Sequence, residues 1–439
     1  MALSWGPHRL LAFMPYGLVA LGCGTPANLA RANGMAGSAM AVAGGESVLE
    51  AGTSALGSAG AGGAPTGGAG VGGAPTASAG TASDDAGGAS VGPALCQSSS
   101  TPGAAPPAQW LNATGNLAGT PAGCVTLGKV LAQPCSTRIV AGVEQAGLFA
   151  SDDAGKSWQK LGSGTGSAAI TNSVTNLVFD PAHPEVSWET GIRGAGGLYR
   201  SSDNGTTYVE LGALTFTQTV SVDFSDPERK TLVTGTHGMQ QQVFHSSDGG
   251  KTWDNIGLNL PDDNYAAETP LVLDSKTFLI GGNRGGAGSE SGIYRTTDAG
   301  MSWKPVGSVQ VNHFGVPLWA SDGAIYWPLY GASGMAKSSD RGLTWSKLPE
   351  SALRGVSPIE LPDASLVTLG TDHVVRSTDG GATWTPTGEP LPFQLVGDAA
   401  SLTYSAATKT FFVSHYDCSS GSVASDAIVS AGFDYLDLK

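Results

Sequence analysis

One phrase, written HSSDGGKTW at residues 245 to 253, recurs with variations six times and limits the possible folds more than any other feature. The copies read LFASDDAGKSW from 148, LYRSSDNGTTY from 198, VFHSSDGGKTW from 243, IYRTTDAGMSW from 293, MAKSSDRGLTW from 335 and VVRSTDGGATW from 374. Their aspartates stand 50, 45, 50, 42 and 39 residues apart. This spacing fits one four-stranded sheet per repeat.

Each repeat also contains two apolar segments ahead of its phrase, as in LVFDPAHPEVSWETGI, so a unit has strands A, B, C and D with the phrase between C and D. Sheets of this length arranged around a channel form a propeller, and six phrases require at least six blades. At the end, SLTYSAAT, KTFFVSHY and DAIVSAGF supply strands A to C of a seventh blade, which lacks a D strand.

The missing strand is found near the start of the repeats, where AQWLNATGNL at 108 to 117 matches KTWDNIGLNL at 251 to 260. Pairing the two ends of the domain in one blade closes the ring and leaves no exposed sheet edge. We therefore predict an all-β, seven-bladed β-propeller of four-stranded antiparallel blades, closed by an N-terminal strand that completes the last blade.

The segments before the repeats predict export and a tether. The apolar run from Leu10 to Leu21 is too short to span a bilayer and reads as a signal peptide. Its end, Ala20-Leu21-Gly22-Cys23, resembles a bacterial lipobox, so residues 1–23 are assigned as a signal whose Cys23 is lipidated, with ordinary cleavage elsewhere as the alternative. Residues 24–107, rich in Gly, Ala, Ser and Pro, are expected to be a disordered tether, and residues 108–439 form the propeller.

Charge and cysteine content agree with an exported protein. A net charge of -14 argues against nucleic-acid binding, which needs a basic surface. We expect an outer-membrane or cell-surface lipoprotein, or otherwise a secreted or periplasmic one, that is monomeric and contacts the membrane only through its lipid. Four further cysteines allow three connectivities, and ring closure favours Cys96 with Cys135 and Cys124 with Cys418. No metal site or cofactor is predicted.

The repeated phrase resembles that of the Asp-box (BNR) propellers, a group that includes bacterial sialidases, xyloglucan hydrolases, sortilin and a photosystem II assembly factor. We expect the box to be a structural turn, in which the carboxylate accepts backbone hydrogen bonds, the glycine takes a positive φ and the aromatic residue packs between sheets. The aspartates assigned this role are Asp153, Asp203, Asp248, Asp298, Asp340 and Asp379. Six aspartates spread around a rim cannot converge on one ligand.

In this topology the B–C and D–A loops lie on the face opposite the boxes, and we expect a ligand to bind there. The B–C loops contribute Glu144, Arg193, His237, Arg284, Tyr330, Asp372 with His373, and His415 with Asp417. The D–A loops add Asp262, Asp263, Tyr265, His313 and Phe314. Arg193 and Arg284 suit a carboxylate, while His373 beside Asp372 forms a candidate acid–base pair, although such surface charges are commonly only solvated.

Two functions remain open. The first is a propeller that binds a carbohydrate or a protein through its loops without catalysis. The alternative, implied by the resemblance, is an Asp-box glycoside hydrolase, sialidase-like or xyloglucanase-like, for which Glu144, Asp372 and Asp417 are weak catalytic candidates. The Arg-Ile-Pro motif of sialidases is absent from TRIVAG at 137 to 142, and only two arginines lie in the B–C loops. A glycosidase would need two carboxylates about 5 to 9.5 Å apart.

Overall fold

The computed structural model describes residues 107–123, 127–194, 197–261, 264–284, 292–312, 314–330, 334–348, 353–395, 400–415 and 421–435, without the side chains of 264–266 and 283–284. These residues belong to the second of the two units into which the chain divides, Gly87–Lys439. The predicted signal and almost all of the predicted tether, with Cys23 and Cys96, lie outside them, as do Cys124 and Cys418. In the described part of the chain, no helix has the length and apolarity needed to span a bilayer.

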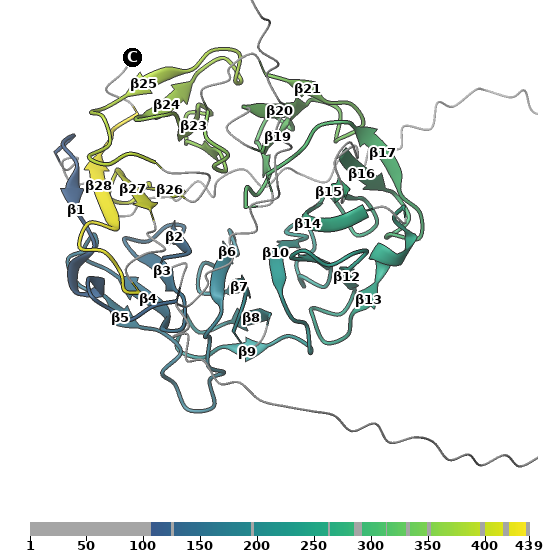
Figure 1. Cartoon of the computed structure of the whole chain (residues 1–439), viewed down its shortest axis with the longest axis horizontal. Helices are drawn as coiled ribbons and strands as arrows, with labels where there is room; N and C mark the ends of the chain where they lie inside the picture. Colours follow the sequence, from purple (N-terminus) through teal and green to yellow (C-terminus); the bar gives the residue numbers. More distant parts are fainter. Residues whose placement is uncertain are drawn as a thin grey trace, which may run out of the picture. The chain divides into compact units, whose positions relative to one another are not determined.

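The described strands form seven four-stranded antiparallel sheets arranged around a centre, which confirms the predicted propeller (Figure 1). Six blades use consecutive strands. Blade 1 has β2 (Lys129–Ala132), β3 (Ile139–Val143), β4 (Gly147–Ser151) and β5 (Gln159–Lys160); blade 2 has β6 (Ser173–Phe179), β7 (Ser187–Ile192), β8 (Leu198–Ser201) and β9 (Val209–Glu210); blade 3 has β10 (Thr217–Val222), β11 (Leu232–Thr236), β12 (Val243–Ser246) and β13 (Asp254–Asn255).

The next three blades follow the same order. Blade 4 has β14 (Asn264–Val272), β15 (Phe278–Arg284), β16 (Gly292–Thr296) and β17 (Lys304–Gly307); blade 5 has β18 (Leu318–Trp319), β19 (Ile325–Pro328), β20 (Met335–Ser338) and β21 (Ser346–Lys347); blade 6 has β22 (Ile359–Glu360), β23 (Leu366–Leu369), β24 (Val374–Ser377) and β25 (Thr385–Thr387). Two short 3-10 helices, η1 (Gly115–Leu117) and η2 (Ile256–Asn259), follow β1 and β13.

Blade 7 joins the two ends of the domain, as predicted. Its strands β26 (Ala400–Ser405), β27 (Thr410–His415) and β28 (Ile428–Gly432) are completed by β1 (Leu111–Asn112). Leu111 pairs with Ser430, and the Ala113 amide donates to the Ile428 carbonyl at 2.8 Å. The Ile428 amide in turn donates to the Thr114 hydroxyl at 3.0 Å. The ring is therefore closed by hydrogen bonds between residues more than 300 positions apart.

Packing between blades supplies the hydrophobic core. Seven buried clusters occur among the described residues, and each combines side chains from two neighbouring blades. For example, Ile139 of blade 1 packs in one cluster with Phe412 of blade 7, whereas Val140 packs with Val174 of blade 2. Because each sheet is covered on both faces, adjacent residues of one strand are both buried, as in β3 (IVAGV) and β11 (LVTGT).

The six Asp boxes form closely similar turns between strands C and D. Each aspartate accepts hydrogen bonds from the backbone amide and the hydroxyl of the Ser or Thr four residues later. The Ser or Thr two residues earlier donates to the same carboxylate and accepts from the box glycine. All six glycines have a positive φ, between 80° and 90°, which explains why the pattern requires glycine.

These hydrogen bonds hold the box carboxylates in their charged form. For Asp298, bonds from the Ser302 hydroxyl, the Thr296 hydroxyl and the Ser302 amide lower the pKa to about 2. The neighbouring aromatic residues are buried to different degrees, from Trp158 and Tyr208, at 4% and 2% exposure, to the partly buried Trp303. The carboxylates are thus occupied by their own turns.

The structure describes one of the four cysteines for which disulfide bonds are predicted. Cys135, in the loop between β2 and β3, is disulfide-bonded. The other four cysteines lie outside the described residues, so the pairing of Cys96 with Cys135 and of Cys124 with Cys418 stays a prediction.

Candidate functional site

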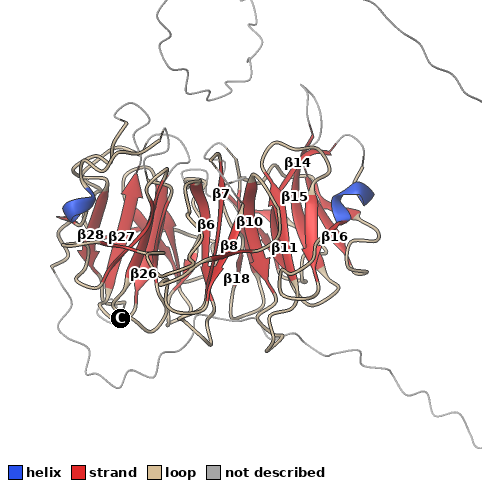
Figure 2. Cartoon of the chain, turned by 90° about the horizontal axis from the view of Figure 1, so that it is seen from below, coloured by secondary structure: helices blue, strands red, loops and turns tan. Residues whose placement is uncertain are grey.

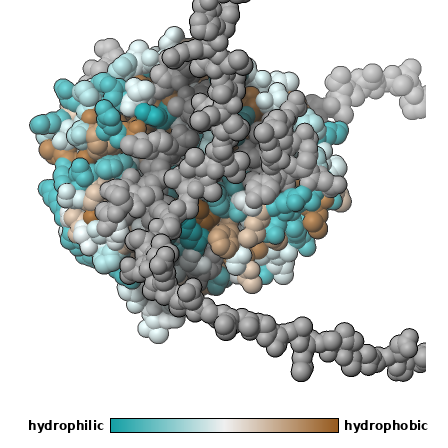
Figure 3. All heavy atoms as spheres, in the orientation of Figure 1, coloured by the Kyte–Doolittle hydropathy of each residue, from teal (hydrophilic) through white to brown (hydrophobic). Residues whose placement is uncertain are grey.

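The strands of the blades stand upright between two faces of the ring (Figure 2). The A–B loops and the Asp boxes lie on one face, here called the box face. The B–C and D–A loops lie on the other, here called the upper face. This separation follows from the antiparallel order of strands within each sheet. Seen in the orientation of Figure 1, the described surface mixes hydrophilic and hydrophobic residues (Figure 3).

Glu144 and Arg193 meet on the upper face at the junction of blades 1 and 2. They follow β3 and β7 directly, and an Arg193 Nη1 lies 3.7 Å from a Glu144 carboxylate oxygen. Only 6% of the Glu144 side chain is exposed, compared with 35% of Arg193. Arg193 has a positive φ of 63°, so the chain turns sharply where β7 ends. The carboxylate of Glu144 is therefore neutralised by an arginine, and the guanidinium retains an exposed edge.

His237 lies at the junction of blades 3 and 4 and packs against two groups from elsewhere in the chain. Its Nδ1 is 3.2 Å from a carboxylate oxygen of Glu268 in β14, which also accepts the Gly238 amide at 2.8 Å. Its ring centroid is 6.3 Å from that of Phe314, which belongs to the D–A loop before blade 5. Glu268 was missed by the sequence analysis, since a single Glu in an otherwise apolar strand (NYAAETPLV) gives no positional signal.

A second aromatic and ionic group lies at blades 6 and 7. Asp372 and His373 are hydrogen-bonded at 2.8 Å, and this bond, with the histidine charge and Thr371, lowers the pKa of Asp372. The ring of His415 contacts that of Phe393, with ring centroids 4.1 Å apart and the two planes tilted by 42°. Asp372 is exposed, with 67% of its side chain accessible, and the predicted pair with His373 is therefore a solvated one.

The remaining predicted residues divide into two sets. Tyr330 is 45% exposed on the upper face, where Phe216, which was not predicted, is 40% exposed. The structure does not describe His313, Asp417, Asp262 and Asp263, nor the side chains of Arg284 and Tyr265. The sequence-predicted residues thus form local groups at blade junctions, and the described ones are not gathered at a single point.

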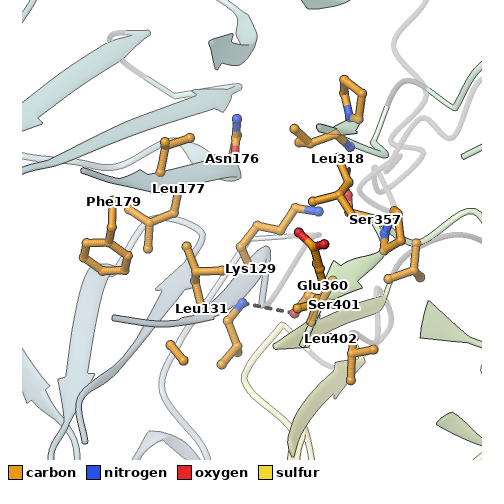
Figure 4. Close-up of a pocket in the computed structure, with 18 of the residues that line it drawn as sticks. Lys129, Leu131, Asn176, Leu177, Phe179, Leu318, Ser357, Glu360, Ser401 and Leu402 are labelled. Atoms are coloured by element: carbon orange, nitrogen blue, oxygen red, sulfur yellow. Dashed lines mark hydrogen bonds between the residues drawn. The ribbon is translucent and has the colours of Figure 1, made fainter. Parts of the chain in front are cut away.

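A mainly apolar cavity formed by described residues is lined by none of the predicted ligand residues. It measures about 410 Å³ and lies inside the ring, between innermost strands β2, β6, β18, β22 and β26 and the loops that lead into them (Figure 4). Apolar side chains form most of its wall, with Lys129, Asn176, Ser357, Glu360 and Ser401 as its polar members. Sequence reasoning examined the loops and overlooked the strands that face the axis.

Comparisons with known proteins identify proteins with low sequence identity to this chain. No family model matches the chain. Over 225 residues, 49% of the chain, it is 26% identical to a probable oligoxyloglucan-reducing end-specific xyloglucanase of Neosartorya fischeri, and the match spans 25% of that protein. A structure of YCF48 bound to D1 peptide resembles 74% of this chain and 96% of that one, with a TM-score of 0.47 and 12% identity.

A crystal structure of the GH74 enzyme of Niastella koreensis resembles 70% of this chain and 61% of that one, with a TM-score of 0.34 and 14% identity. The matched region therefore covers about a quarter of the curated xyloglucanase and less than two thirds of the solved GH74 chain. The likeness to solved structures concerns the fold alone. The chain is a seven-bladed β-propeller built on Asp boxes, and half of it is similar in sequence to a xyloglucanase.

Proposed function

We propose that this protein is a non-catalytic binding propeller that holds an oligosaccharide on its upper face. The observation that carries the proposal is the presence of exposed aromatic rings from separate loops on that face. Phe216 and Tyr330 are 40% and 45% exposed, and the side chain of His237, whose ring lies near that of Phe314, is 36% exposed. Aromatic rings offer flat apolar surface at low entropic cost, and neighbouring polar groups fix orientation.

Two further observations favour a sugar over other ligands. Arg193 with Glu144, and His237 with Glu268, supply polar groups on the same face as the rings, and hydroxyl-rich ligands need such donors and acceptors. The xyloglucanase of Neosartorya fischeri, to which half of the chain is similar, has an oligoxyloglucan as its named substrate. The N-terminal signal and tether expected from the sequence would present such a module outside the cell, lipid-anchored through Cys23.

The carboxyl groups favour binding over hydrolysis. Asp372 has a lowered pKa, which suits a permanent anion and not a general acid. Glu144 is paired with Arg193, and its side chain is nearly buried. Glu189 does have a raised pKa, of about 8, but it is 0% exposed between blades and out of reach of a substrate. Of these three carboxyl groups, Glu189 is the one with a raised pKa, and it is buried.

A glycan array tests this proposal, with the full chain probed against xyloglucan oligosaccharides and other cell-surface glycans. We expect binding to at least one oligosaccharide class and no new reducing ends when the bound glycan is incubated with the protein. Release of reducing ends in proportion to protein concentration would instead establish the hydrolase alternative, and Glu144→Gln and Asp372→Asn would then be compared. No glycan signal, together with saturable binding to a protein, would overturn the oligosaccharide proposal.

A further inference from the structure

The central cavity contains one cationic group at its upper end. Lys129 is the first residue of β2, and its Nζ donates to the Phe314 carbonyl at 3.2 Å. An ammonium group has three N–H donors, so a single carbonyl leaves donor capacity for a ligand. The side chain is half-buried, and desolvation lowers its pKa to about 8 without a contribution from any acidic neighbour. An anion placed beside it would restore the charge that burial disfavours.

The walls below Lys129 are apolar. Leu131, Leu177, Leu318 and Leu402 line the cavity, and Phe179 lies with them (Figure 4). Cavities of a few hundred cubic ångströms with mainly apolar walls and a few polar groups are typical small-molecule sites. A ligand that fills this cavity should combine an anionic head with an apolar body.

A carboxylate at the other end of the strands restricts the ligand further. Glu360 is the last residue of β22, is 5% exposed, and accepts hydrogen bonds from the Ser321 amide at 2.9 Å and the Ser321 hydroxyl at 2.5 Å. Ser321 belongs to an A–B loop, so this carboxylate lies toward the box face, whereas Lys129 starts its strand at the upper face. A second anionic group on the ligand would approach Glu360 and be repelled.

From these contacts we propose that the central cavity is a binding site for a small monocarboxylate with an apolar body. The carboxylate pairs with the Lys129 ammonium, the hydrocarbon contacts the leucines, and the Glu360 end excludes dicarboxylates. This site differs from the oligosaccharide surface in its lining residues and in ligand chemistry, and the two meet at Phe314, whose carbonyl accepts from Lys129 and whose ring lies near His237. Either proposal can fail while the other holds.

Calorimetric titration of the full chain with octanoate, octanamide and suberate tests the site, using Lys129→Met and, as a control that removes one exposed charge from the box face, Lys251→Met. We expect octanoate to bind. Octanamide should bind at least about 10-fold more weakly because it lacks the charge-assisted hydrogen bond, which contributes about 1.5 to 3 kcal/mol. Suberate should also bind at least about 10-fold more weakly, because its second carboxylate approaches the Glu360 carboxylate. Lys129→Met should weaken octanoate binding by about 10- to 100-fold, and Lys251→Met should not change it.

A measurement on the unsubstituted protein keeps the proposal testable if Lys129→Met does not fold. In a protein with isotope-labelled lysine, NMR should show the Lys129 Nζ titrating near pH 8 alone and at a higher pH with octanoate bound. The proposal is overturned if octanoate does not bind, if octanamide or suberate binds as tightly, if Lys129→Met binds octanoate normally, or if the Lys129 titration is unchanged.

Discussion

Replacing Trp158 with alanine is expected to lower the free energy of unfolding by about 3 to 5 kcal/mol, the usual cost of deleting a large buried aromatic side chain. Trp158 is 4% exposed, and its indole N–H donates to the carbonyls of Ala113 and Gly155, each at 3.1 Å. Ala113 directly follows the closing strand β1. The indole of Trp158 therefore links the first Asp box to the segment that closes the propeller.

Urea denaturation of the full chain measures the loss, with Leu343→Ala as the matched control. Leu343 also lies in an Asp box but is 53% exposed, so its removal should cost less than about 0.5 kcal/mol. Limited proteolysis should also become faster within residues 107–120 in the Trp158 variant. Equal stabilities for the two variants would mean that the first box does not hold the closing strand.

Replacing Glu189 with glutamine is expected to stabilise the protein by about 1 to 3 kcal/mol at pH 7 to 8. Glu189 is 0% exposed, and burial raises its pKa from 4.5 to about 8, with a partial offset from a long hydrogen bond donated by Asn172 at 3.4 Å. One of its oxygens has no hydrogen-bond partner. The folded protein therefore binds a proton here that the unfolded chain has already released.

Glu189 makes the stability of the folded protein decrease as the pH rises. The pKa of Glu189 is raised in the folded state. The resulting contribution to the free energy of unfolding is therefore fully present below about pH 4.5 and is lost progressively as the pH rises to about 8. Thermal melts of Glu189→Gln should match those of the unsubstituted protein at pH 4 and exceed them at pH 8. Glu210→Gln, on exposed β9 of the same blade, should leave the pH profile unchanged. A uniform shift at every pH would contradict the raised pKa.

The fold was predictable because its signals are local and repeated. The match of AQWLNATGNL to KTWDNIGLNL predicted β1 as the counterpart of β13, and the structure shows that a short 3-10 helix follows each of these strands, which was not predicted. The Asp box, repeated at blade spacing, marks six of the blades. The last repeat contains only strands A to C, which indicates that its D strand comes from elsewhere in the chain. No long-range information was needed beyond that pairing.

The site was harder to predict because its polar residues depend on contacts between blades. Arg193 and Glu144 were assigned to the same face, but sequence could not show that they neutralise each other. Lys129, Glu189 and Glu268 stand in strands whose alternation looks ordinary, and their significance arises only when a neighbouring blade or the central cavity surrounds them. The burial of a charged side chain depends on the tertiary structure and cannot be predicted from the sequence of a single strand.

The central claim is that the Asp boxes build the ring and that the ligand binds on the opposite face. The most direct test compares the affinity of the best glycan from the array for Tyr330→Ala, on the upper face, and for Met301→Ala, in an Asp box and 73% exposed. The account predicts about 10-fold weaker binding for Tyr330→Ala, from loss of one aromatic contact, and an unchanged affinity for Met301→Ala. Weaker binding by Met301→Ala with a normal Tyr330→Ala would contradict it.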